Sequence, residues 1–88
     1  MRVKVICTGN FKDGGARYVA QRLALKNSIK GFAKKENEST MSLELQGDET
    51  SVNQLLETFS KGNAFYSVET IEKELIDEVS TEKFFSIK

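Results

Sequence analysis

The segment from Thr8 to Tyr18 constrains the fold most, because it joins two runs of different hydrophobic period. Before it, Arg2 to Cys7 alternates apolar and polar residues with period two, which is typical of a strand with one buried face. After it, residues 17–28 are rich in strong helix formers. The adjacent glycines Gly14 and Gly15 lie between the two runs. The sequence therefore predicts a strand, a tight turn and a helix in direct succession.

Further along the chain, the apolar pattern predicts a hairpin, a second helix and two more strands. The predicted strands cover residues 31–37, 40–46, 64–75 and 83–87. The second helix is indicated by apolar residues at i, i+3, i+4 and i+7, namely Val52, Leu55, Leu56 and Phe59. The first helix is expected to bury a broad side formed by Val19, Ala20, Leu23, Ala24 and Leu25. The order β-α-β-β-α-β predicts a ferredoxin-like α+β sandwich, an antiparallel sheet with both helices on one face.

Composition narrows the chemistry that a chain of this size can carry. The 88 residues suit a single domain over 1–88, and 13 basic residues balance 13 acidic ones, which gives no general attraction to nucleic acid or to an anionic membrane. We find no apolar window of about 18 residues and no signal-peptide core, so a cytoplasmic location is expected. The chain has no histidine, and Cys7 is its only cysteine, so neither a metal nor another cofactor is expected.

The turn between the first strand and the first helix has the parts of an anion site. Two glycines let several backbone N–H groups point inward, and the start of a helix adds partial positive charge. Arg17 supplies a planar fork of donors that suits a phosphate group. The predicted phosphate-binding residues are consecutive in the sequence: Lys12, Asp13, Gly14, Gly15, Ala16 and Arg17.

Over essentially its whole length the chain resembles the acylphosphatase family. The resemblance rests on Gly9 and Arg17 at the family separation, the Gly31-Phe32 pair, the Gly47-Asp48-Glu49 turn and the closing Phe85-Ser86-Ile87 strand. It implies hydrolysis of the carboxyl-phosphate bond of an acyl phosphate, with Arg17 and the loop amides holding the phosphoryl group and an Asn amide positioning the attacking water. The implied ligands are a small acyl phosphate and inorganic phosphate, and a monomer is expected.

The position of the family Asn is occupied by Lys35 when the strand is counted from Gly31. An ammonium donates hydrogen bonds and accepts none, so Lys35 can attract phosphate but cannot accept a proton from water. Asn37, two residues later, is the alternative residue for the water, provided that a bulge shifts the strand register. Asp13 also departs from the family pattern, and its carboxylate repels phosphate unless it turns outward or pairs with a neighbouring cation.

Three other functions share this predicted fold. One is a catalytically impaired protein that keeps only an anion-binding or regulatory role, which the Lys35 substitution favours. Another is a dimeric module that binds a small regulatory ligand between sheets. RNA-recognition domains also share the β-α-β-β-α-β order, but the predicted strand from Met41 to Leu45 has no aromatic residue on which a base could stack.

Overall fold

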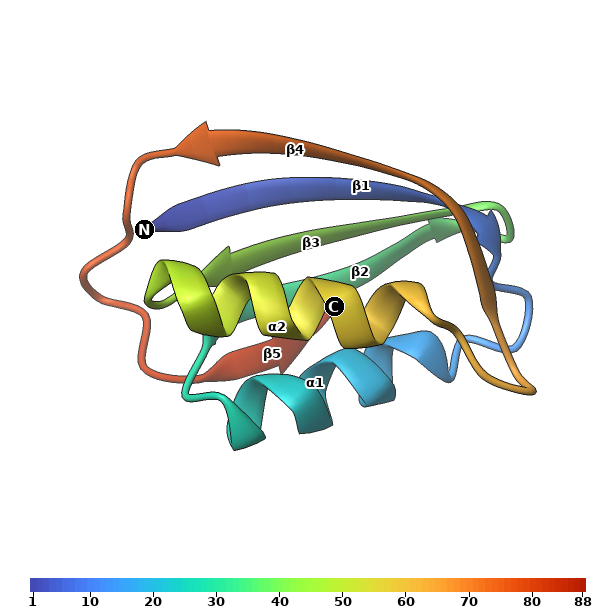
Figure 1. The fold of residues 1–88 in the computed structure, drawn as a ribbon, viewed down its shortest axis with the longest axis horizontal. Helices are drawn as coiled ribbons and strands as arrows, with labels where there is room; N and C mark the ends of the chain where they lie inside the picture. Colours follow the sequence, from blue (N-terminus) through green and yellow to red (C-terminus); the bar gives the residue numbers. More distant parts are fainter.

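The computed structural model describes all 88 residues and consists of five strands and two helices. In chain order they are β1 (Arg2–Asn10), α1 (Ala16–Lys26), β2 (Lys30–Asn37), β3 (Thr40–Gln46), α2 (Glu49–Ser60), β4 (Ser67–Ile76) and β5 (Phe85–Ile87). Both helices lie on the same side of the sheet (Figure 1). This is the predicted ferredoxin-like α+β arrangement, with β5 as a fifth strand.

The strands form one sheet in the order β4-β1-β3-β2-β5. The pairs β1–β3, β1–β4 and β2–β3 are antiparallel, as predicted, whereas β5 pairs in parallel with β2. The parallel pair follows from the route of the chain. After β4, residues 77–84 cross the sheet at the end where β1 begins, so β5 enters from that end and runs in the direction of β2 (Figure 1).

The core lies between the sheet and the two helices, and 18 buried apolar residues form one cluster there. Strand alternation supplies Val3, Val5 and Cys7 from β1. Helix α1 buries a narrower stripe than predicted, because only Ala16, Ala20 and Ala24 are buried, at i, i+4 and i+8. Leu25 was expected on this side and is instead 72% exposed, since it lies one residue beyond the stripe.

Local interactions determine where helix α2 begins and ends. Asp48 is its N-cap, and its carboxylate accepts hydrogen bonds from the backbone N–H (2.8 Å) and the hydroxyl (3.0 Å) of Ser51. These bonds lower the pKa of Asp48. The helix ends before Gly62, whose φ of +67° is left-handed. All four residues of its predicted apolar face are buried: Val52, Leu55, Leu56 and Phe59.

Strand β4 begins at Ser67, later than predicted, because residues 63–66 form a turn. The side-chain oxygen of Asn63 accepts the N–H groups of Phe65 (2.7 Å) and Tyr66 (3.2 Å). The β1–β4 register shifts between Thr8 and Gly9. No helix of the structure has the length and apolarity needed to cross a membrane.

Candidate active site

The strand-to-helix loop lies at the end of β1, beside the turn that joins β2 and β3. Two backbone hydrogen bonds connect them, from Gly9 N–H to the Ser39 carbonyl (3.0 Å) and from Phe11 N–H to the Glu38 carbonyl (2.8 Å). Phe11 is fully buried and stacks on Tyr66 with ring centroids 6.2 Å apart. The loop is therefore anchored at its first half by backbone pairing and by an aromatic side chain in the core.

Of the five backbone amides from Lys12 to Ala16, three donate within the loop. Lys12 N–H donates to the Asn10 side chain, Gly14 N–H to the Phe11 carbonyl and Gly15 N–H to the Asp13 carboxylate, each at 3.2 Å. The amides of Asp13 and Ala16 donate to no acceptor of the protein. The Ala16 amide opens helix α1, where the N–H groups have no partner within the helix. The loop thus has two amides without an acceptor in the protein, of which that of Asp13 belongs to an exposed residue and that of Ala16 to a residue that is only 1% exposed.

Arg17 is half-buried and is held by main-chain oxygens rather than by acidic side chains. Its Nε donates to the Gly14 carbonyl (3.4 Å) and its Nη1 to the main-chain oxygen of Lys88 (3.0 Å). No acidic side chain lies within ion-pair distance of it. Gly14 has a φ of +78°, which disfavours other residues, whereas a Cβ there would be in ordinary van der Waals contact with Nη2 at 3.4 Å. Arg17 keeps most of its donors available for a ligand.

Lys35 reaches the loop from β2, whereas Asn37 does not. The Lys35 ammonium donates to the Lys12 carbonyl at 3.0 Å. A bulge is present between Lys35 and Asn37, as the alternative for Asn37 required, but the Asn37 side-chain oxygen accepts the Ser39 N–H at 2.8 Å. That bond belongs to the hairpin turn. The structure therefore brings Lys35, and not Asn37, into contact with the predicted phosphate loop.

Asp13 turns toward the loop and forms no ion pair with Lys12 or Arg17. One carboxylate oxygen, Oδ1, accepts the Gly15 N–H, and the other has no hydrogen-bond partner. Gly15 is required for this placement, because a Cβ at that position would lie only 2.8 Å from Asp13 Oδ1. The two glycines thus differ: Gly14 adopts a left-handed φ, and Gly15 leaves space for the Asp13 carboxylate.

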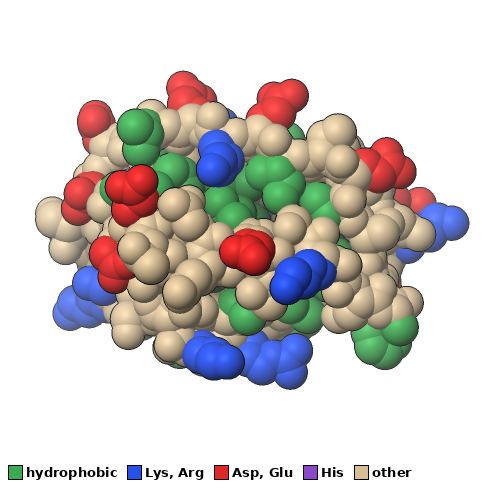
Figure 2. Space-filling view, in the orientation of Figure 1, with side chains coloured by type: hydrophobic (Ala, Val, Ile, Leu, Met, Phe, Trp, Pro, Cys, Tyr) green, Lys and Arg blue, Asp and Glu red, His purple; other side chains and the backbone are tan.

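The charge around the loop is locally positive although the chain is neutral overall. Helix α1 has no acidic residue in its first turn and carries Arg17, Arg22 and Lys26 along its length. On the face drawn in Figure 2, basic side chains are more frequent in the half toward α1 and acidic ones in the half toward β4. An anion approaching the start of α1 therefore meets more positive than negative charge.

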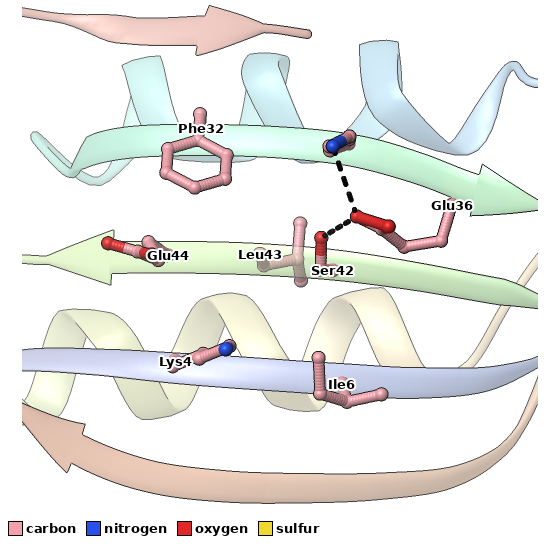
Figure 3. Close-up of a pocket in the computed structure, with 8 residues that line it drawn as sticks. Lys4, Ile6, Phe32, Glu36, Ser42, Leu43 and Glu44 are labelled. Atoms are coloured by element: carbon pink, nitrogen blue, oxygen red, sulfur yellow. Dashed lines mark hydrogen bonds and ion pairs between the residues drawn. The ribbon is translucent and has the colours of Figure 1, made fainter.

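The largest hollow of the molecule lies elsewhere, on the face of the sheet that the helices leave open. It has a volume of about 350 Å³. Of its four charged side chains only Lys4 forms no ion pair. Glu36 accepts the Ser42 hydroxyl at 3.0 Å and lies 3.7 Å from the Lys34 ammonium (Figure 3). Glu44, also on its wall, is paired with Arg2. This hollow offers a ligand few free polar groups.

Arg2, at the start of β1, has an environment unlike that of Arg17. It is 2% exposed, and its guanidinium lies 2.8 Å from the Glu44 carboxylate and 2.7 Å from that of Glu82. The Glu82 hydrogen bond is the main cause that raises its pKa. A further donor goes to the side chain of Gln46 (3.0 Å), which also pairs with both main-chain polar groups of Val79. This cluster fixes residues 77–84 across the end of the sheet.

Two contacts of the site were missed by sequence reasoning. Lys88 supplies an acceptor to Arg17 across 71 residues of sequence, and only the parallel pairing of β5 with β2 brings it there. No local pattern indicates such a contact. Asn10 accepts the Lys12 N–H two residues ahead. That bond has a signal, because Asn commonly binds the backbone two residues ahead in turns.

With this geometry established, comparison with known proteins gives a consistent result. The acylphosphatase family model matches residues 3–87. The acylphosphatase of Geobacillus kaustophilus (strain HTA426) is 36% identical over 86 residues, which is 98% of this chain and 92% of the relative. That of Clostridium acetobutylicum is 39% identical over 85 residues, or 97% and 91% of the two chains. The crystal structure of acylphosphatase from Bacillus subtilis matches with a TM-score of 0.89 at 23% identity and covers 99% of this chain and 97% of that one, which supports the fold. The chain belongs to the acylphosphatase family.

Proposed function

We propose that this protein hydrolyses acyl phosphates to a carboxylate and phosphate, and that the loop from Lys12 to Arg17 binds the phosphoryl group. The observation that carries the assignment is the set of hydrogen-bond partners of the Arg17 guanidinium. Its guanidinium is fixed by two main-chain oxygens, has no acidic partner and lies beside the unpaired Ala16 amide. A fixed cation with free donors at the start of a helix suits a phosphoryl dianion.

Phosphoryl transfer requires little covalent chemistry from the protein. The phosphorus passes through a transition state with charge spread over its oxygens, so that fixed donors and correct positioning supply most of the catalysis. Arg17 and the amides of Asp13 and Ala16 would bind two or three of these oxygens. Lys35 would add a second cation from the β2 side, because two of its three ammonium protons are free of the Lys12 carbonyl.

The partners that we propose are small molecules, an acyl phosphate as substrate and inorganic phosphate as product. Neither nucleic acid nor a membrane is proposed, because the net charge is zero and the charged side chains around the hollow on the open sheet face are paired except for Lys4. A monomer is supported by the charge of the edge strand β4, which carries Glu69, Glu72 and Glu74 but only one basic residue, Lys73. Two copies that paired along this edge would bring like charges together.

A cytoplasmic location is supported by the state of the only cysteine. Cys7 is fully buried in β1, and burial raises its pKa to about 11. A protonated thiol without access to solvent is neither a disulfide partner nor a reactive group. The protein thus needs no oxidising compartment to fold.

The proposed function is tested by following phosphate release from acetyl phosphate with the purified full chain. Catalysis should be measurable above the spontaneous rate, and inorganic phosphate should inhibit it competitively as a product that binds the same loop. The matched control is Arg22→Lys, which changes another arginine of α1 and should leave the rate unchanged. Phosphate binding at the loop without any turnover would instead support the anion-binding alternative.

A further inference from the structure

The first half of the proposed phosphate loop is a four-residue turn. The Gly14 N–H donates to the Phe11 carbonyl at 3.2 Å and closes the turn. The central peptide group of this turn joins Lys12 to Asp13. Its carbonyl accepts a hydrogen bond from the Lys35 ammonium at 3.0 Å, whereas its N–H, which is that of Asp13, donates to no acceptor of the protein. One side of this peptide group is therefore fixed by another strand, and the other side is unpaired.

The planarity of the peptide group determines the direction of the unpaired N–H. All peptide bonds of the chain are trans, and in a trans peptide the C=O and N–H bonds point in opposite directions. Because the Lys12 carbonyl points at the Lys35 ammonium, the Asp13 N–H points away from it. An anion that binds this N–H lies on the side of the peptide group opposite Lys35. Lys35 thus acts on this donor through the carbonyl.

A turn of this kind has an alternative in which its central peptide group is turned over. The alternative, type II, requires a positive φ at the third residue of the turn. Asp13 is the third residue, and its φ is not positive, because Ser28 is the only residue other than glycine with a positive φ. In the alternative, the Asp13 N–H would face the Lys35 ammonium, which cannot accept a hydrogen bond. Lys35 therefore favours the orientation that the structure shows.

Strand β2 directs Lys35 toward the loop. Lys35 lies on the same face of the strand as the fully buried Ala33, because alternate residues of a strand share a face. The neighbouring Lys34 lies on the opposite face, where it pairs with Glu36. Lys35 is half-buried and forms no ion pair with an acidic side chain that would draw its ammonium away from the loop.

We propose that Lys35 is a positioning residue, which fixes the Lys12–Asp13 peptide group so that the Asp13 N–H is directed at the phosphoryl group before the substrate binds. A donor that is already oriented costs no reorganisation during the reaction, so it stabilises the transition state more than a donor that must first rotate. This role is separate from the positive charge that Lys35 adds. The inference rests on the proposed function, because it explains how one donor of the same site is held.

The first test follows the Asp13 amide by ¹⁵N NMR in Lys35→Met, which keeps an unbranched side chain of similar length but removes the donor. Without phosphate, the Asp13 signal should move or broaden, because its peptide group is no longer held in one orientation. On titration with inorganic phosphate, the Asp13 amide should lose most of its response, while the Arg17 side chain should still respond. The matched control is Lys34→Met, which removes the same charge from the opposite face of β2 and should leave the Asp13 amide unchanged.

The second test measures acetyl phosphate hydrolysis in two variants of Lys35. In Lys35→Met, kcat/KM should fall about 10-fold or more, since one donor to the phosphoryl oxygens is no longer oriented. Lys35→Arg keeps a donor within reach of the Lys12 carbonyl, so its kcat/KM should stay within about threefold of the wild type. The Asp13 amide of Lys35→Arg should also respond to inorganic phosphate.

Two results would contradict the positioning role and leave the proposed function intact. An Asp13 amide that keeps its wild-type signal and phosphate response in Lys35→Met would show that the peptide group is held without Lys35, and any loss of kcat/KM would then come from the lost charge. Equal losses in Lys35→Met and Lys35→Arg would exclude the hydrogen bond as the cause. Wild-type protein that neither binds phosphate at the loop nor hydrolyses acetyl phosphate would contradict the proposed function itself, even if Lys35→Met moved the Asp13 signal.

Discussion

Arg2 begins strand β1 and Arg17 lies in the first turn of α1, beyond the other end of β1, and the two arginines differ in what holds them. Arg2 is buried against Glu44 and Glu82, and its donors are used by carboxylates and by an amide. Arg17, beyond the other end, is bound by two main-chain oxygens and has no acidic partner. The first arginine is neutralised within the protein, and the second is left to meet an anion from solution.

The partners of each guanidinium distinguish Arg2, a structural cation, from Arg17, a candidate binding cation, more clearly than burial or charge alone. Removing one partner of a buried ion pair leaves the others uncompensated, so Arg2 should matter for stability. Two main-chain oxygens orient Arg17 and no acidic side chain pairs with it, so Arg17 should matter for ligand binding. Arg17→Lys and Arg2→Met each change one of these two arginines, and the effects of the two substitutions on activity and on stability are compared.

The largest effect is expected for Arg17→Lys. A lysine keeps the charge but cannot reproduce the planar fork of donors, and loss of one such transition-state donor costs roughly 3 kcal/mol, or about 100-fold in kcat/KM. Acetyl phosphate kinetics measure the loss, and thermal unfolding should stay close to the wild type. A variant with unchanged kcat/KM would show that the phosphoryl group binds elsewhere.

At the opposite end, Arg2→Met should lower the free energy of unfolding by about 3 kcal/mol, because Glu44 and Glu82 lose their common partner. Urea unfolding followed by circular dichroism measures it. The kcat for acetyl phosphate should change little while the variant remains folded. If Arg2→Met instead lost activity without losing stability, the contrast between the two ends would be wrong.

The third prediction concerns the core between the two ends. Burial raises the pKa of Cys7 from its ordinary value of 9.0 to about 11, so the folded protein holds the thiol proton more tightly than the unfolded chain does. The free energy of unfolding should therefore fall as pH rises from 9 to 11, by on the order of 2 kcal/mol. Cys7→Ala removes this contribution, so the free energy of unfolding should depend less on pH in that variant. An unchanged pH dependence would assign the effect to other groups such as Tyr66, because burial also raises the pKa of Tyr66.

The smallest effect is expected from a chelator. No group of three or more Cys, Asp or Glu side chains lies close enough to hold a metal ion, and the proposed catalysis uses only Arg17, Lys35 and backbone amides. Acetyl phosphate hydrolysis should be the same with and without EDTA. Loss of activity with EDTA, restored by a divalent ion, would require a metal-dependent mechanism.

Much of the fold could be predicted from the sequence because the hydrophobic periods are regular. The alternation in β1 indicates only a strand, and the i, i+3, i+4, i+7 pattern of α2 indicates only a helix. All the residues that these patterns predicted to be buried are buried. The predictions were wrong where contacts between residues far apart in the sequence determine burial or strand pairing. Leu25 belongs to a helical face whose width is set by the sheet, and the parallel pairing of β5 depends on the path of residues 77–84.

The site could be predicted only in its local parts. The glycine turn, Arg17 and the start of α1 are continuous in sequence, so the loop could be proposed as a candidate from its residues alone. The Lys35 contact with Lys12 and the Lys88 contact with Arg17 span 23 and 71 residues, and no local pattern encodes them. Whether Lys35 or Asn37 reached the loop depended on a bulge and on the hairpin turn that uses Asn37.

The most direct test of the contrast between the two arginines is a titration of the ¹⁵N-labelled protein with inorganic phosphate, followed by NMR. We expect the largest shifts at the free amides of Asp13 and Ala16 and at the Arg17 side chain, with no change in the Arg2 side chain. Arg17→Lys should weaken the response, and Arg22→Lys should not. Shifts confined to residues outside the loop, or a response centred on Arg2, would contradict the assignment of the site.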